Sequence, residues 1–163
     1  MIFRLSGIAN DSIVDGPGLR LAVFFQGCPY DCPGCHNPHT HDPLGGKEAD
    51  TEDVIRMMDA NPLLDGLTLT GGEPLMQPQA ALTLAQAAKA RGLNVWLYTG
   101  STYEVIMGSP DADTQALLAL CDVLVDGPYV QAQRSLELQY RGSRNQRVID
   151  MVKTRESGSL TER

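Results

Sequence analysis

The chain has little that would suit a membrane, a nucleic-acid surface or a disulphide scaffold. No apolar run approaches the roughly 20 residues of a membrane-spanning helix, and the first residues lack the apolar segment of a signal peptide. With 20 acidic and 13 basic residues the formal net charge is -7, which argues against general binding to phosphates. We therefore expect a cytoplasmic protein that binds neither nucleic acid nor membrane.

Cysteine is also scarce. The 163 residues contain four cysteines, too few for the disulphide framework of a small secreted domain. Three stand close together as Cys28-x-x-x-Cys32-x-x-Cys35, whereas Cys121 lies in an apolar stretch and is predicted to be a buried, inert thiol. Because iron-sulphur clusters are usually held by four thiolates, a compact set of three leaves one ligand to a substrate or cofactor. With one of the three histidines in residues 36–41, the same cysteines would instead make a closed zinc site.

Neither repeats nor low-complexity segments interrupt the chain, and no interdomain linker is visible. Its 163 residues fit one domain that is large enough for a full hydrophobic core. Short apolar segments, predicted as strands, alternate with segments predicted as helices. The strands are 21–25, 67–70, 94–98 and 123–125, and the helices begin near Thr51, Pro78 and Ser109. This order predicts an α/β fold with a parallel sheet and flanking helices.

Residues with unusual chemistry follow the C-terminal ends of these predicted strands. Cys28 follows the first strand, Gly71-Gly72-Glu73-Pro74 the second, Thr99-Gly100 the third and Asp126-Gly127-Pro128 the fourth. Parallel sheets and barrels place their ligands at this edge. A Gly-Gly turn or an aspartate after a strand is more often structural than functional, but their shared position predicts one common cleft.

Together these motifs resemble the radical S-adenosylmethionine (SAM) superfamily. The segments VDGPGLR (14–20), FQGCP (25–29) and CHNP (35–38) are similar to those of glycyl-radical-enzyme activators within it. The segments 123–130 and 141–148 resemble those of activators of anaerobic ribonucleoside-triphosphate reductases. The resemblance implies an incomplete TIM-type βα barrel, with one radical SAM domain over residues 1–150 and a flexible C-terminal tail over 151–163.

The resemblance also implies an activity. Cys28, Cys32 and Cys35 are expected to bind three irons of a 4Fe-4S cluster, with SAM on the fourth iron. One electron from the cluster would split SAM into methionine and a 5'-deoxyadenosyl radical, which would take a hydrogen atom from one glycine of the reductase. A flavodoxin or ferredoxin would supply the electron. Because the cofactors carry this chemistry, no catalytic side chains are expected beyond the cluster ligands.

The resemblance assigns further residues to the SAM site. Glu73 with the backbone of Gly71 and Gly72 is expected to hold the methionyl amino group by charge-assisted hydrogen bonds. Gly34 stands where many superfamily members have an aromatic residue near the adenine, which leaves His36 as a candidate for that contact. The remaining candidates of the site are Pro74, Thr99 and Asp126.

The partner surface and the function leave alternatives open. Candidate partner contacts are Asp15, Gly16, Arg141, Arg144 and Arg147. Two alternative functions are open: the chain activates a different glycyl-radical enzyme, or it is a non-catalytic module with structural zinc. An iron-sulphur electron carrier is disfavoured, because the Gly-Gly-Glu-Pro turn would then have no purpose.

Overall fold

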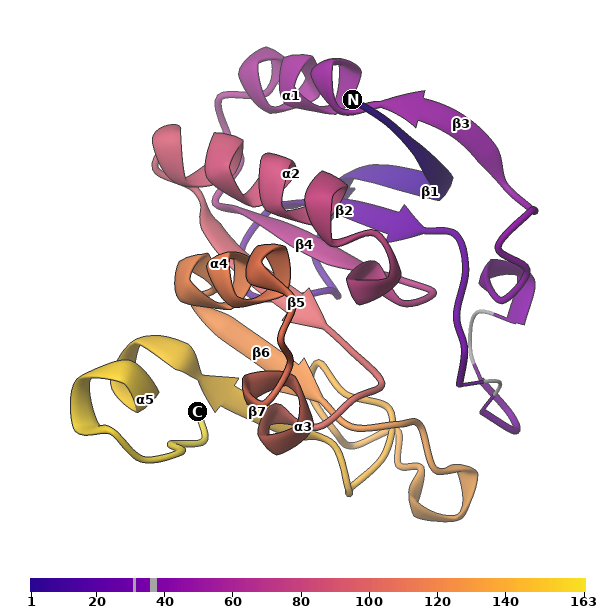
Figure 1. The fold of residues 1–163 in the computed structure, drawn as a ribbon, viewed down its shortest axis with the longest axis vertical. Helices are drawn as coiled ribbons and strands as arrows, with labels where there is room; N and C mark the ends of the chain where they lie inside the picture. The colour runs from indigo at the N-terminus through magenta and orange to yellow at the C-terminus, as the bar shows by residue number, and fades with distance from the viewer. Residues whose placement is uncertain (31, 36–37) are drawn as a thin grey trace.

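A computed structural model of the chain describes residues 1–30, 32–35 and 38–163. They form a mixed α/β fold around one seven-stranded sheet with the order β3-β1-β2-β4-β5-β6-β7 (Figure 1). The strands are β1 (Ile2–Ser12), β2 (Arg20–Phe25), β3 (Lys47–Asp50), β4 (Gly66–Gly71), β5 (Asn94–Tyr98), β6 (Val123–Asp126) and β7 (Arg147–Asp150).

Five α-helices accompany the sheet in the described residues. They are α1 (Thr51–Ala60), α2 (Pro78–Ala90), α3 (Tyr103–Met107), α4 (Ala112–Leu120) and α5 (Met151–Ser157). Most begin at a side chain that satisfies a free backbone N–H: Asp50 caps α1, Asp111 caps α4 and Asp150 caps α5. The helices predicted near Thr51, Pro78 and Ser109 are thereby confirmed.

The predicted parallel sheet is confirmed for its four central strands. β2, β4, β5 and β6 run parallel, in that order across the sheet. The flanking strands are antiparallel: β1 pairs with β2 and with β3, and β7 pairs with β6. Parallel neighbours need a crossover, which the helices supply, whereas β1 reaches β2 through the short connection 13–19 and so returns antiparallel.

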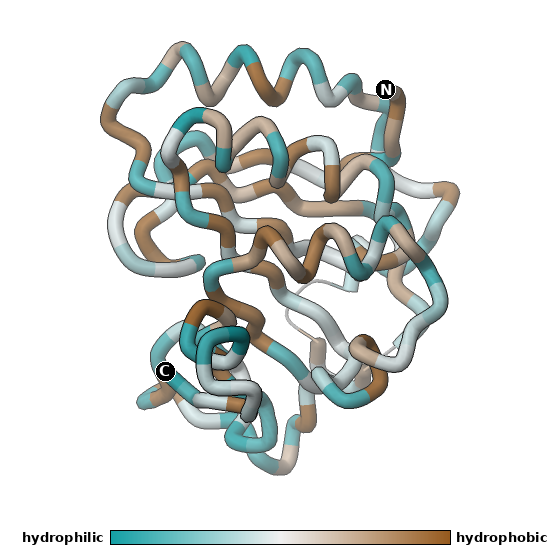
Figure 2. The backbone as a smooth tube through the Cα atoms, turned by 60° about the vertical axis from the view of Figure 1, so that its left-hand side comes forward, coloured by the Kyte–Doolittle hydropathy of each residue, from teal (hydrophilic) through white to brown (hydrophobic). Residues whose placement is uncertain are grey.

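The two faces of the sheet differ in character. Residues such as Leu69, Leu97 and Leu124 point to the face covered by α1, α2 and α4 and form the main hydrophobic core. Figure 2 shows hydrophobic residues concentrated along these strands and on parts of the helices. Because strand side chains alternate, the opposite face carries a second and more polar set, which includes Thr68 and Trp96.

Residues 151–163 fold back beside β7. Residues 151–157 form α5, in which Met151 and Thr154 are buried. An isolated bridge joins Ile149 of β7 to Glu162, so the chain turns back toward the sheet after α5. No helix within the described ranges has both the length and the apolar character needed to cross a bilayer.

Candidate iron-sulphur and SAM site

The cysteine loop begins directly after β2 and is closed at its stem by two backbone hydrogen bonds. Gly27 N donates to Thr40 O at 2.6 Å, and Cys28 N donates to His41 O at 3.1 Å. Together they join Gly27 and Cys28 to Thr40 and His41 at the C-terminal end of a parallel strand. The loop therefore leaves the sheet at the edge where the sequence predicted a ligand.

The three clustered cysteines line one cavity of about 370 Å³. Cys28, Cys32 and Cys35 are each half-buried, and Cys35 N donates to Cys32 O at 3.0 Å. Thr70, at the end of β4, lines the same cavity, so the cavity lies on the sheet face opposite the helices. The volume of the cavity falls within the roughly 300–1,000 Å³ of small-molecule sites.

The donor set fits an iron-sulphur cluster. Burial raises the pKa of the Cys28 thiol, and the nearby Glu73 carboxylate acts in the same direction. A cationic centre would offset this by stabilising the thiolate, the form that binds metal. Within the described ranges no group of three His, Cys, Asp or Glu side chains surrounds a single-ion position. A cluster does not need such a group, because each cysteine binds a different iron.

The Gly-Gly turn after β4 is where backbone packs against backbone. Gly71 has φ +103°, a conformation that favours glycine. A Cβ on Gly72 would lie 2.4 Å from Gly27 O and 2.9 Å from Thr40 O. Gly72 therefore lets the β4 turn lie directly against the stem of the cysteine loop, and both glycines line the cavity.

Glu73 lies behind the cavity wall. Its side chain is only 2% exposed and is not among the groups that line the cavity. Oε1 accepts from Thr99 Oγ1 at 2.9 Å and from Gly100 N at 2.7 Å, and Oε2 accepts from Leu75 N at 3.1 Å. Burial outweighs these hydrogen bonds and raises the Glu73 pKa to about 7. The carboxylate thus joins the turn after β4 to the turn after β5.

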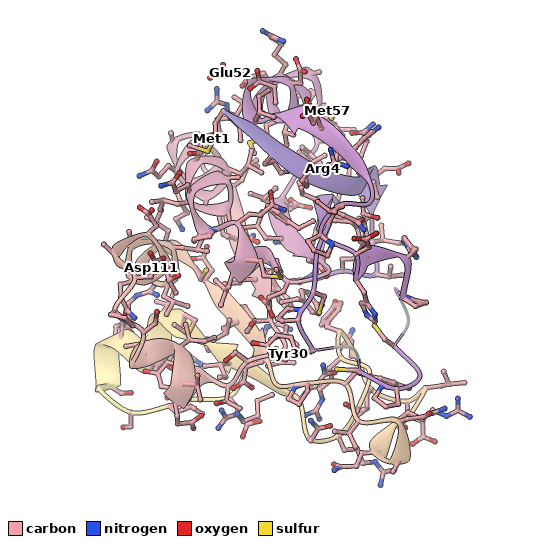
Figure 3. The ribbon with its side chains drawn as sticks, turned by 45° about the vertical axis from the view of Figure 1, so that its right-hand side comes forward. Met1, Arg4, Tyr30, Glu52, Met57 and Asp111 are labelled. Atoms are coloured by element: carbon pink, nitrogen blue, oxygen red, sulfur yellow. The ribbon has the colours of Figure 1, made fainter. Side chains whose placement is uncertain are left out.

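The turn after β5 forms another wall of the cavity. Thr99 and Gly100 both line it, as sequence reasoning expected of Thr99. The ring of Tyr30 packs on Gly100 so closely that a Cβ there would lie 2.6 Å from its Cδ2. Figure 3 shows Tyr30 in the lower half of the view, whereas Glu52 and Met57 of α1 lie at the top.

Asp126 points to the helix side of the sheet. It follows Val125, which lines the cavity, so strand alternation turns its side chain the other way. The carboxylate is 1% exposed, accepts from Tyr103 N at 2.8 Å and forms an ion pair with Arg147. Arg147 also pairs with Glu104, whose pKa it lowers to about 2 through their hydrogen bonds. This network joins β6, β7 and α3.

Other predicted residues divide between the cavity and its surroundings. Asp15 and Arg141 line the cavity. Gly16, Pro74 and Arg144 do not line it, although Gly16 directly follows Asp15, which does. The adenine contact expected of His36 lies outside the described residues.

Four tyrosines at the cavity were not anticipated from the sequence. They are Tyr30, Tyr98, Tyr129 and Tyr140. Tyr140 meets Trp96 edge-on, with ring centroids 5.1 Å apart. For Tyr98 the signal in the sequence was the alternation of β5, where Trp96 and Tyr98 face away from the apolar Val95 and Leu97.

Comparisons with known proteins also indicate an iron-sulphur cluster. Residues 14–149 match a family model described as a 4Fe-4S single cluster domain. The chain is 37% identical over 143 residues to the anaerobic ribonucleoside-triphosphate reductase-activating protein of Vibrio cholerae, covering 82% of this chain and 89% of the relative. It is 34% identical to the protein of that name from Escherichia coli, covering 82% and 90%. It is also 36% identical over 117 residues to the pyruvate formate-lyase-activating enzyme of Clostridium pasteurianum, covering 66% of this chain and 49% of the relative.

Proposed function

This chain belongs to the family of anaerobic ribonucleoside-triphosphate reductase-activating proteins, and from that premise we propose that it generates the glycyl radical of such a reductase. Its cofactors are a 4Fe-4S cluster and SAM. The observation that carries the proposal is that Cys28, Cys32 and Cys35 line one cavity with the Gly71-Gly72 turn. A structural zinc module would not account for the match to a 4Fe-4S single cluster domain.

The residues of the cavity have distinct proposed tasks. The three cysteines would hold a 4Fe-4S cluster with one iron left open for SAM. When bound, the cluster would supply the one-electron chemistry that cleaves SAM and so allows a hydrogen atom to be removed from the reductase glycine. Gly71 and Gly72 let the backbone approach the methionyl end, and Thr99 forms the adjacent wall.

Glu73 and Asp126 act in this proposal from outside the cavity lining. Glu73 supports the wall through Thr99 and Gly100, and Pro74 begins the short helical turn that Glu73 caps. Asp126, held by Arg147 and Tyr103 N, positions the end of β6 beside the methionyl group. The adenine contact of His36 stays a prediction.

The fold is proposed to be the incomplete βα barrel of radical SAM enzymes, as one domain over residues 1–150. Four parallel strands with helices on one face and the cavity on the other support this assignment. The proposed electron donor is a flavodoxin or ferredoxin. We further propose a cytoplasmic location, because the cluster cysteines must stay reduced.

Mixing the reconstituted protein with a purified anaerobic ribonucleoside-triphosphate reductase, SAM and a reductant tests the function. The expected result is the electron paramagnetic resonance doublet of a glycyl radical on the reductase, absent without SAM. A reductase that stays radical-free while SAM is cleaved would contradict the proposed partner.

Activation of a pyruvate formate-lyase is the second candidate, favoured by the likeness to the Clostridium pasteurianum enzyme. The same experiment with a purified lyase separates the two. A glycyl radical on the lyase alone would favour this second candidate, whereas a radical on the reductase alone supports the first.

A further inference from the structure

The turn between β1 and β2 reaches the mouth of the cavity that the cysteines line. Val14 and Asp15 line this cavity together with Cys28, Cys32 and Cys35. Ile13 and Val14 are 72% and 73% exposed, so two adjacent apolar side chains face solvent at this turn. The turn therefore combines a cavity wall with an apolar outer surface.

A buried arginine lies beneath this turn. Arg20, the first residue of β2, is 0% exposed. Its Nη1 donates to Pro17 O at 3.0 Å, within the turn, and its Nη2 donates to Leu67 O at 2.9 Å in β4. A Cβ on Gly16 would lie 2.7 Å from Arg20 Nε, so the turn rests directly on the guanidinium.

Thr68 of β4 provides a second connection between Arg20 and the turn. Arg20 Nε donates to Thr68 Oγ1 at 2.7 Å, and the same hydroxyl donates to Asp15 O at 2.8 Å. Because the hydroxyl has one hydrogen, accepting from Arg20 leaves that hydrogen for Asp15 O. One guanidinium thus holds the turn at Pro17 directly and at Asp15 through Thr68.

A charged, hydrogen-bonded guanidinium is not needed merely to fill the space beneath the turn. The three hydrogen bonds go to uncharged oxygens, and the Trp96 ring lies 5.5 Å from Arg20 Cζ. Burial lowers the Arg20 pKa to about 10, so the group stays charged at neutral pH. Desolvating a cation is costly unless its donors are satisfied, and an apolar side chain would fill the same space without that cost.

We propose that Arg20, acting with Thr68, is a positioning residue that holds the turn 13–18 at the cavity mouth to receive the glycine-bearing segment of the reductase. The inference rests on the proposed function. A short-lived radical formed at the cluster must meet its target glycine in the same cavity, so residues that line both the cavity and its mouth are placed to contact that segment. The apolar Ile13 and Val14 supply contact area outside the cavity.

Thr68 is the best place for the test, because its side chain lies beneath the turn and does not line the cavity. Thr68→Val keeps the shape of the side chain and removes both hydrogen bonds, whereas Thr68→Ser keeps the hydroxyl as a matched control. Two rates are measured on each reconstituted protein. One is 5'-deoxyadenosine formation without reductase, and the other is glycyl radical formation at increasing concentrations of reductase.

We expect Thr68→Val to cleave SAM at the wild-type rate without reductase. Its half-saturating reductase concentration should rise, and the glycyl radical formed per SAM cleaved should fall by about tenfold, as expected for two weakened hydrogen bonds. Thr68→Ser should restore both values. Arg20→Lys, which keeps the charge but loses the fork of donors, should resemble Thr68→Val.

Two results would overturn the inference. One is an equal fall of SAM cleavage and radical formation in Thr68→Val. Arg20 and Thr68 would then support the cluster site or the folding of the chain, and not the contact with the reductase. The other is an unchanged radical yield and reductase dependence in a variant that melts at the wild-type temperature. Wild-type protein that cleaves no SAM would instead refute the proposed function, and this inference with it.

Discussion

Replacing Gly72 by alanine should weaken the cluster site through one methyl group. The new Cβ would lie 2.4 Å from Gly27 O and 2.9 Å from Thr40 O, both backbone atoms at the stem of the cysteine loop. No side-chain rotation relieves these contacts, so the stem must move away from the turn after β4. Gly27 O also accepts from Glu73 N at 2.7 Å, and this hydrogen bond would lengthen.

Overpacking of this kind costs about 1–3 kcal/mol, which for a chain of this size lowers the melting temperature by about 2–4 °C per kcal/mol. Gly7→Ala is the matched control, because a Cβ at Gly7 would meet nothing within 4 Å. After anaerobic reconstitution we expect Gly72→Ala to hold less iron per chain and to form less 5'-deoxyadenosine than wild type. Gly7→Ala should match wild type in both.

The outcome that would refute this reasoning is a Gly72→Ala protein with the full complement of iron and the wild-type rate of SAM cleavage. The close approach of Gly72 to the loop stem would then have no part in holding the cluster.

Three further predictions concern buried groups near the site. Cys121→Ser should leave iron content and SAM cleavage unchanged. It should lower the free energy of unfolding by only about 1 kcal/mol, because the hydroxyl can still donate to Leu117 O. Loss of iron in the folded variant would contradict the cluster assignment. The raised Glu73 pKa of about 7 means that the folded chain binds a proton more tightly than the unfolded chain. Its contribution to stability is therefore present below pH 4.5 and declines by up to about 3 kcal/mol as the pH rises to 7. Urea unfolding of the metal-free chain at several pH values should show this decline in wild type relative to Glu73→Gln, and identical profiles would refute it. Arg147→Ala should lower the free energy of unfolding by about 3–5 kcal/mol, because it leaves Asp126 buried without its cation; urea unfolding that shows a loss below 1 kcal/mol would argue against the ion pair.

The sequence predicted the centre of the sheet but not its edges. β2, β4, β5 and β6 are recognisable because short apolar runs end at glycine or aspartate. β3 has the sequence Lys-Glu-Ala-Asp and pairs with β1 at the edge of the sheet, so its polar composition gives no strand signal. β1 is irregular, since its register shifts between Leu5 and Gly7 and between Ala9 and Ser12.

The sequence likewise predicted only part of the candidate site. Spacing alone brought Cys28, Cys32 and Cys35 together, and strand order brought the Gly71-Gly72 turn beside them. Side-chain direction was harder to predict: Asp126 follows the correct strand but points to the helix side, where Arg147 meets it. The role of Arg20 depends on contacts with distant segments, and local sequence does not encode such contacts.

The most direct test of the central claim is the formation of 5'-deoxyadenosine and methionine from SAM by the anaerobically reconstituted protein with a strong one-electron reductant. The account predicts both products from wild type in equal amounts, and none from Cys28→Ser, Cys32→Ser or Cys35→Ser. A folded wild-type protein that holds iron but yields neither product, or that yields them equally without these cysteines, would contradict it.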